Sequence, residues 1–148
     1  MDNRPGWDRW GLDVALTVAT RADCTRRQIG AVILRQSDHA IVATGYNGAP
    51  KGQPGCLTAG ACPRGQANSV APGSSYDTGA GSCIAIHAEQ NAVLRASWSD
   101  MVDSTMYVTD VPCDGCIRML QGTPLERVIY PVAGQPNVAR TIYLKEPT

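Results

Sequence analysis

Side chains that zinc accepts as ligands fall in two short motifs of this 148-residue sequence. The first motif is His87-Ala88-Glu89, and the second is Pro112-Cys113-Asp114-Gly115-Cys116. One histidine and two cysteine thiolates form a ligand set of catalytic zinc, which keeps a fourth position open for water. Glu89, two residues after the histidine, would then carry the proton of that water. The two motifs therefore predict a site for metal-assisted hydrolysis.

Two helices are expected to position these side chains, one over residues 85–96 and one over residues 113–121, which follows Pro112. His87 would lie near the start of the first helix. Cys113 and Cys116, at positions i and i+3, would face one way from the first turn of the second. Both helix N-termini would point at the metal, and their partial positive charge favours the thiolates that bind zinc.

The remaining pattern predicts an α/β fold. A helix is expected over residues 7–22, an antiparallel strand pair over residues 29–34 and 40–46, and later strands over residues 105–109 and 127–130. Residues 137–144 read as a short helix or an edge strand. This order of elements suits a central mixed sheet of about five strands covered by helices.

Composition narrows the class of protein. At 148 residues with 43% hydrophobic content, residues 1–148 are expected to form a single domain. Thirteen basic and thirteen acidic side chains give a net charge of zero, which favours a small-molecule substrate over nucleic acid. The charged N-terminus and the lack of an apolar run of about 18 residues predict a cytoplasmic protein without a membrane span. Its six cysteines are then expected to be metal ligands or core residues rather than disulfides.

A glycine- and proline-rich stretch interrupts the regular pattern. Residues 45–82 hold nine of the fifteen glycines and four of the ten prolines, which predicts a long loop inserted at about residues 47–82. Cys56 and Cys62 lie within this loop and Cys83 at its exit. We expect metal to pin the ends of the loop and residues 68–81 to be its mobile part.

The two motifs together form the H-x-E and P-C-x-x-C signature of zinc nucleobase deaminases. A C-x-x-C motif alone also occurs in structural zinc sites and redox proteins, but the preceding proline and the paired histidine and glutamate favour the deaminase. In that chemistry, activated water attacks the amine-bearing ring carbon. Glu89 protonates the adjacent ring nitrogen and then the departing ammonia.

Five blocks extend the likeness to most of the chain, and on them the sequence resembles the deoxycytidylate (dCMP) deaminases of the cytidine-deaminase superfamily. The blocks are residues 7–10, 24–31, 45–52, 87–92 and 107–109, so the resemblance covers roughly residues 7–131. It implies the three-layer cytidine-deaminase-like fold and conversion of dCMP to dUMP. It also implies that Asn47 binds the sugar and that residues 45–52 lie beside the substrate or an allosteric nucleotide. Ala88 is a further expected substrate contact.

The resemblance carries three more expectations. Arg26, Arg27 or Lys51 is expected to neutralise a substrate phosphate, with Arg26 the first choice. Some members of the family have a second, structural zinc, for which Cys24, Cys56, Cys62 and Cys83 are the candidate ligands here, although any of the four is equally suited to a core. Family members also form dimers or hexamers and respond to Mg-dCTP and dTTP.

Two departures from the family pattern leave the substrate open. Residues 131–136 contain no aromatic side chain where the family usually has a tyrosine, and residues 122–125 replace the usual Ala-Gly-Ile turn. The alternatives are a modified cytosine nucleotide or nucleoside, and a nucleic-acid editing deaminase.

Overall fold

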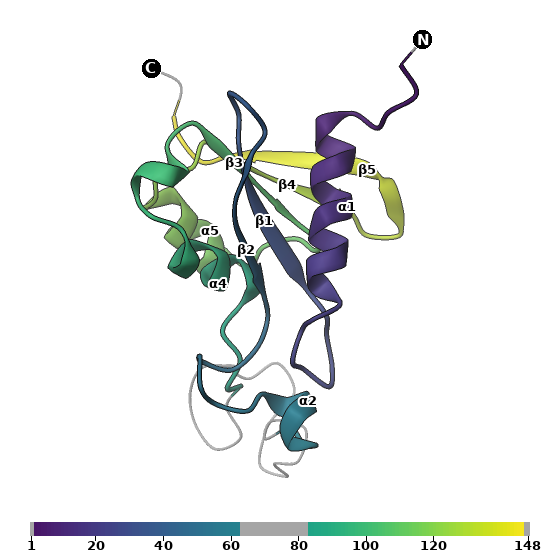
Figure 1. The fold of residues 1–148 in the computed structure, drawn as a ribbon, viewed down its shortest axis with the longest axis vertical. Helices are drawn as coiled ribbons and strands as arrows, with labels where there is room; N and C mark the ends of the chain where they lie inside the picture. The colour runs from purple at the N-terminus through teal and green to yellow at the C-terminus, as the bar shows by residue number, and fades with distance from the viewer. Residues whose placement is uncertain (1, 63–82, 147–148) are drawn as a thin grey trace.

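The computed structural model describes residues 2–62 and 83–146. They form a five-stranded sheet in the order β2-β1-β3-β4-β5 (Figure 1). β3 and β4 pair in parallel, whereas the other neighbouring strands pair antiparallel. The predicted mixed sheet of an α/β fold is thus confirmed. The strands are β1 (Gly30–Arg35), β2 (Ile41–Tyr46), β3 (Ser104–Val108), β4 (Arg127–Val132) and β5 (Gln135–Tyr143).

Helices cover both faces of the sheet, which gives three layers. Helix α1 (Trp7–Ala19) lies on one face, and helices α4 (Ala88–Arg95) and α5 (Asp114–Gln121) lie on the other (Figure 1). A single-turn helix, α2 (Cys56–Ala59), and a 3-10 turn, η1 (Ser99–Met101), lie in the connections. Within the described residues, no helix has the length and apolar character needed to cross a membrane.

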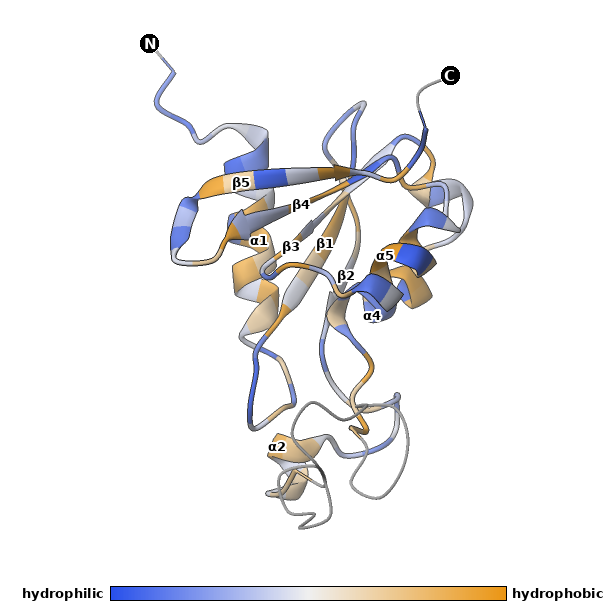
Figure 2. Cartoon of the chain, turned by 180° about the vertical axis from the view of Figure 1, so that it is seen from behind, coloured by the Kyte–Doolittle hydropathy of each residue, from blue (hydrophilic) through white to orange (hydrophobic). Residues whose placement is uncertain are grey.

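The interior strand β1 is buried on both faces, which explains its continuous apolar sequence. Val32 and Leu34 belong to the cluster that includes Leu12 and Ala15 of α1. The alternate side chains, such as Ile33, belong to the cluster shared with α4 and α5. Figure 2 shows the hydrophobic colouring of this strand inside the sheet. The alternation of side chains along one strand therefore builds two cores.

Two glycines allow the helices to approach the strand backbones closely. A Cβ atom on Gly30 would lie 2.1 Å from the carbonyl oxygen of Ala15 in α1. A Cβ atom on Gly45 would lie 2.3 Å from the backbone nitrogen of Ala92 in α4. Gly45 is the first residue of the 45–52 block of the sequence. A glycine is needed at this position because α4 packs directly on the backbone of β2.

Helix boundaries differ from the predicted ones by a few residues. α1 ends at Ala19 rather than at residue 22, and α4 begins at Ala88 rather than at residue 85. The later start of α4 follows from the extended backbone of His87, which is its N-cap residue. The C-terminal tail, predicted as a short helix or an edge strand, forms the edge strand β5.

The prediction of an unbroken loop over residues 45–82 is wrong at α2. The carboxylate of Asp23 accepts hydrogen bonds from the Gly55 nitrogen (3.0 Å), the Thr58 nitrogen (2.8 Å) and the Thr58 hydroxyl (2.7 Å). The Thr58 hydrogen bonds hold the pKa of Asp23 below its usual value. This cap comes from a residue far away in sequence, so local periodicity could not indicate it. Residues 68–81, predicted to be mobile, lie outside the described residues.

Candidate active site

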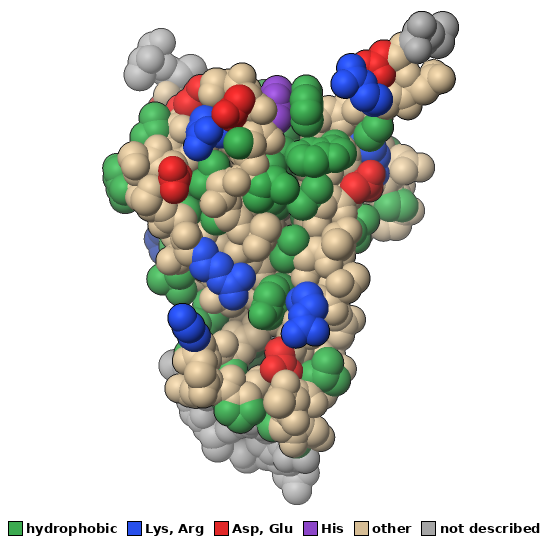
Figure 3. Space-filling view, viewed as in Figure 1, with side chains coloured by type: hydrophobic (Ala, Val, Ile, Leu, Met, Phe, Trp, Pro, Cys, Tyr) green, Lys and Arg blue, Asp and Glu red, His purple; other side chains and the backbone are tan. Residues whose placement is uncertain are grey.

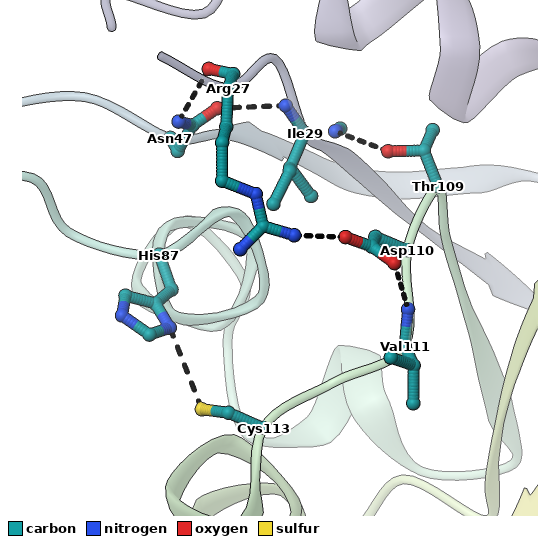
Figure 4. Close-up of polar contacts among 9 residues, drawn as sticks. Arg27, Ile29, Asn47, His87, Thr109, Asp110, Val111 and Cys113 are labelled. Atoms are coloured by element: carbon teal, nitrogen blue, oxygen red, sulfur yellow. Dashed lines mark hydrogen bonds and ion pairs between the residues drawn. The ribbon is translucent and has the colours of Figure 1, made fainter. Parts of the chain in front are cut away.

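Three potential metal ligands meet where two helices begin. His87 is the N-cap residue of α4, Cys113 is the N-cap residue of α5, and Cys116 lies in the first turn of α5. The Nδ1 atom of His87 lies 3.7 Å from the Sγ of Cys113 and 3.3 Å from the Sγ of Cys116. All three ligand atoms lie within 4.8 Å of one another. Figure 4 shows the His87 ring directed toward Cys113.

These distances fit a tetrahedral zinc centre. At a tetrahedral angle, bond lengths of about 2.0 Å for Zn–N and 2.3 Å for Zn–S place nitrogen and sulfur ligands about 3.5 Å apart. The two nitrogen–sulfur distances lie on either side of that value. Across residues 2–62 and 83–146, no second group of three histidine, cysteine or acidic residues is as compact. A His-Cys-Cys set is also the donor chemistry of a catalytic rather than a closed structural zinc.

Local hydrogen bonds hold the ligands in place. The backbone nitrogen of His87 donates to Oε1 of Gln90 at 2.9 Å, which fixes the entry of the chain into α4. The backbone nitrogen of Cys116 donates to the Sγ of Cys113 at 3.4 Å, so the first thiol also caps its own helix. Both ligand positions are therefore set by the way the two helices start.

Burial raises the pKa of the Cys116 thiol above its ordinary value, and the negative charge of Glu89 raises it further. The side chain is 1% exposed. The metal-free thiol is therefore protonated at neutral pH, and the metal has to displace this proton when it binds. Metal affinity consequently increases as the pH rises.

Glu89 lies beside the ligands in the first turn of α4, with 5% of its surface exposed. Glu89, His87 and Cys113 line one cavity of about 280 Å³. A carboxylate in this position can exchange protons with a molecule that enters the cavity.

The three predicted substrate contacts, Asn47, Ala88 and Arg26, line the same cavity. Asn47 is buried, and its side-chain amide already holds backbone groups. Its Oδ1 accepts a hydrogen bond from the Ile29 nitrogen at 2.9 Å, and its Nδ2 donates to the Arg27 carbonyl at 3.0 Å. The sequence motif did not indicate this structural role, because the partners of Asn47 lie about twenty residues earlier in the chain.

An ion pair joins Arg27 to Asp110 in the wall of this cavity (Figure 4). Arg27 was one of three arginine or lysine candidates for binding a phosphate, but Asp110 was not predicted to be part of the site. The signal in the sequence was an acidic residue two positions before Pro112. It becomes meaningful only when the sheet brings the end of β3 beside the start of β1.

Cys24, Cys56, Cys62 and Cys83 also line the cavity. Burial raises the pKa of the Cys56 thiol, and the neighbouring thiols of Cys62 and Cys24 raise it further. No three of these four thiols lie within the 4.8 Å that groups the catalytic ligands. The structure therefore brings the four cysteines into one cavity without the compact geometry of a four-thiolate site.

The family model described as the cytidine and deoxycytidylate deaminase zinc-binding region matches residues 5–132. The chain belongs to this family. The resemblance inferred from the sequence motifs is confirmed, and the fold is that of a zinc-binding deaminase domain.

Among curated relatives, the deoxycytidylate deaminase of Mycobacterium phage D29 is 43% identical over 129 residues, covering 87% of this chain and 97% of the phage protein. The deoxycytidylate deaminases of Saccharomyces cerevisiae and Schizosaccharomyces pombe are 35% and 34% identical over 86% of this chain. The deaminase domain spans only 38% and 37% of those two proteins.

Solved structures share the fold. A dCMP deaminase from the cyanophage S-TIM5, solved in complex with dCMP and dUMP, superposes with a TM-score of 0.63 at 24% identity over 87% of this chain and 83% of the phage chain. RibD from Acinetobacter baumannii superposes with a TM-score of 0.53 at 19% identity, covering 84% of this chain and 28% of RibD. The predicted three-layer deaminase fold is therefore confirmed.

Proposed function

We propose that this chain catalyses the hydrolytic deamination of dCMP to dUMP and ammonia. The observation that carries the proposal is the meeting of the ligand atoms of His87, Cys113 and Cys116 at a cavity that the buried Glu89 lines together with His87 and Cys113. The 43% identity to a phage deoxycytidylate deaminase over nearly its full length supports dCMP as the substrate.

His87, Cys113 and Cys116 would hold the zinc, which when bound lowers the pKa of a water molecule and makes it a nucleophile. Glu89 takes the proton from this water and donates it to the ring nitrogen next to the amine-bearing carbon. The same carboxylate then takes the second proton, from the newly formed C–OH group, and passes it to the departing amine; the C–N bond breaks, the ring carbonyl forms and the amine leaves as ammonia. Its burial keeps bulk water from competing for this proton.

Asn47, Ala88 and Arg26 are the proposed substrate contacts. Asn47 would offer its remaining amide hydrogen to the sugar while holding the backbone beside it. Ala88 lies between the metal ligand and the proton carrier, where its small side chain leaves room for the base. Arg26 forms no ion pair within residues 2–62 and 83–146, so its guanidinium is available for the phosphate of the nucleotide.

An ammonia-release screen tests the substrate. Among dCMP, CMP, deoxycytidine, cytidine, cytosine and 5-substituted dCMP, dCMP should give the highest kcat/KM. A higher value for a modified nucleotide or a nucleoside would replace dCMP as the substrate. Deamination of single-stranded oligonucleotides in preference to all of these would overturn the proposal, and it is not expected from a chain with zero net charge.

We further propose that the four remaining cysteines bind a structural zinc, which would draw their thiols closer together than they lie here. In the cytoplasm, where we place the protein, these thiols would stay reduced. The purified protein should contain two zinc ions per chain, and Cys56→Ser should contain one while keeping His87, Cys113 and Cys116 loaded. One zinc per chain with four titratable thiols in the unmodified protein would remove the structural site.

Regulation and assembly are proposed from the family resemblance. An open groove of about 900 Å³ is lined by Arg21, Lys51 and Arg95 together with the loop after β2. Figure 3 shows basic side chains around this hollow. We propose it as the site for Mg-dCTP or dTTP, which the ammonia assay tests when either nucleotide is added at constant dCMP. The chain would act as a homo-oligomer, a dimer or a hexamer.

A further inference from the structure

The wall of the catalytic cavity contains a charge pair that the deamination chemistry does not use. The Nη2 atom of Arg27, which precedes β1, donates to Oδ2 of Asp110, which follows β3. Both residues line the cavity together with His87 and Glu89. In Figure 4 the guanidinium of Arg27 extends from the side of Asn47 toward Asp110, over the loop that leads to Cys113.

Both members of the pair are held by further hydrogen bonds. The carbonyl of Arg27 accepts a hydrogen bond from Nδ2 of Asn47 at 3.0 Å. Oδ1 of Asp110 accepts one from the Val111 nitrogen at 2.8 Å, so both oxygens of the carboxylate are engaged. The chain segments that carry the pair are joined next to it, where the Gly30 nitrogen donates to the Thr109 hydroxyl at 3.1 Å. The backbone of Arg27 and the carboxylate of Asp110 are thus both held beside the cavity.

Solvent limits what this pair adds to the stability of the fold. The side chains of Arg27 and Asp110 are 62% and 38% exposed, and ion pairs at such positions stabilise a protein by about 0–1 kcal/mol. Their main effect is therefore on the charge of the cavity. An unmasked carboxylate in this wall would repel a phosphate monoester, whereas a carboxylate paired with Arg27 is neutralised.

The pairing leaves part of the guanidinium available. Of the Arg27 side-chain nitrogens only Nη2 donates to Asp110, and no other hydrogen bond joins the Arg27 side chain to another residue within 2–62 and 83–146. Arginine carries five N–H donors in a planar fork, and this fork matches the oxygens of a phosphate group. A second anion can therefore bind Nε or Nη1 while Asp110 keeps the side chain in place.

From these contacts we propose that the Arg27–Asp110 pair selects substrates that carry a 5′-phosphate. Arg27 binds the phosphate, Asp110 orients the guanidinium, and Asn47 is a positioning residue that acts through the Arg27 carbonyl. The proposal rests on the proposed function, since it specifies how the same cavity distinguishes a nucleotide from a nucleoside. Arg26, from the adjacent position, supplies a second positive charge to the same phosphate.

The test compares kcat/KM for dCMP and for deoxycytidine, which lacks the phosphate. Arg27→Gln should lower the value for dCMP about 10- to 100-fold, the usual effect of losing a hydrogen bond to a charged group, mostly through KM. The value for deoxycytidine should stay within about twofold of the unmodified protein. Arg118→Gln removes the same charge from an exposed position of α5 outside the cavity and should change neither value.

A second substitution separates charge masking from the loss of a contact. In Arg27→Gln the carboxylate of Asp110 is unmasked, so adding Asp110→Asn should restore dCMP turnover several-fold toward the unmodified value. Asp110→Asn alone should change it less than about threefold, since a neutral amide does not repel the phosphate. Arg27→Lys, which keeps the charge, should fall between the unmodified protein and Arg27→Gln.

Two results would overturn the proposal. One is an equal loss for dCMP and deoxycytidine with a lower zinc content, which would mean that the pair only supports the Cys113 loop. The other is a double variant no better than Arg27→Gln. If the unmodified protein deaminates neither compound, the proposed function fails. In that case, calorimetry can measure the affinities of the same zinc-loaded variants for dCMP and deoxycytidine. A loss of affinity for dCMP alone then still shows that the Arg27–Asp110 pair recognises the phosphate.

Discussion

Replacing Glu89 by glutamine should lower the rate of dCMP deamination by about a thousandfold, within the range expected for loss of general acid–base catalysis. Glutamine has the size of glutamate and fills the same buried position, but it cannot take up and return a proton. The zinc content of the variant should equal that of the unmodified protein, because His87, Cys113 and Cys116 remain. Ammonia release and metal analysis on the same preparation measure both quantities.

Glu126→Gln is the matched control for this substitution. Glu126 is exposed and lies outside the catalytic cavity, so its replacement should leave turnover within about twofold of the unmodified rate, as for most surface substitutions. Turnover of Glu89→Gln near the unmodified rate with zinc bound would show that another group carries the proton. A loss of both zinc and activity would instead assign Glu89 a role in metal binding.

The largest loss of stability is expected from Gly30→Ala. The new Cβ would lie 2.1 Å from the Ala15 oxygen and 2.5 Å from the Ala19 nitrogen, so α1 would have to move away from β1. This movement would weaken the contacts of α1 with both β1 and β3. Overpacking of this kind costs about 3 kcal/mol of unfolding free energy, which corresponds to a fall in Tm of roughly 6–12 °C for a chain of this size.

Gly6→Ala provides the comparison for thermal unfolding. No atom lies within 4 Å of a Cβ built at Gly6, although this residue is the N-cap of α1. Its replacement should therefore cost about 1 kcal/mol or less. Equal falls in Tm for the two variants would mean that the close approach of α1 to β1 is not needed for stability.

Much of the architecture could be predicted because its signals are local. The continuous apolar run of β1 and each of the two motifs, residues 87–89 and 112–116, lie within a short window of sequence. The start of α5 could be placed to within one residue from Pro112, whereas the start of α4 was predicted three residues too early. The mixed sheet followed from the order of the elements.

The features that were missed depend on contacts between distant segments. The short helix α2 exists where Asp23 caps it from the connection before β1. The amide of Asn47 is occupied because β2 brings it beside the backbone at residues 27–29. Asp110 joins the site only through the pairing of β1 with β3. In each case a polar side chain satisfies a backbone or charged group that the sequence alone does not place next to it.

The start of each catalytic helix also has a consequence for how the protein responds to strain. The first backbone hydrogen bonds of α4 and α5 run from the Asn91 nitrogen to the His87 carbonyl and from the Ile117 nitrogen to the Cys113 carbonyl, both at 2.9 Å. A ligand residue cannot shift without bending the first turn of its helix. Bound zinc would therefore reduce local unfolding of the helix layer that covers β2. Loss of the metal would increase local unfolding across that helix layer and not only at the cavity.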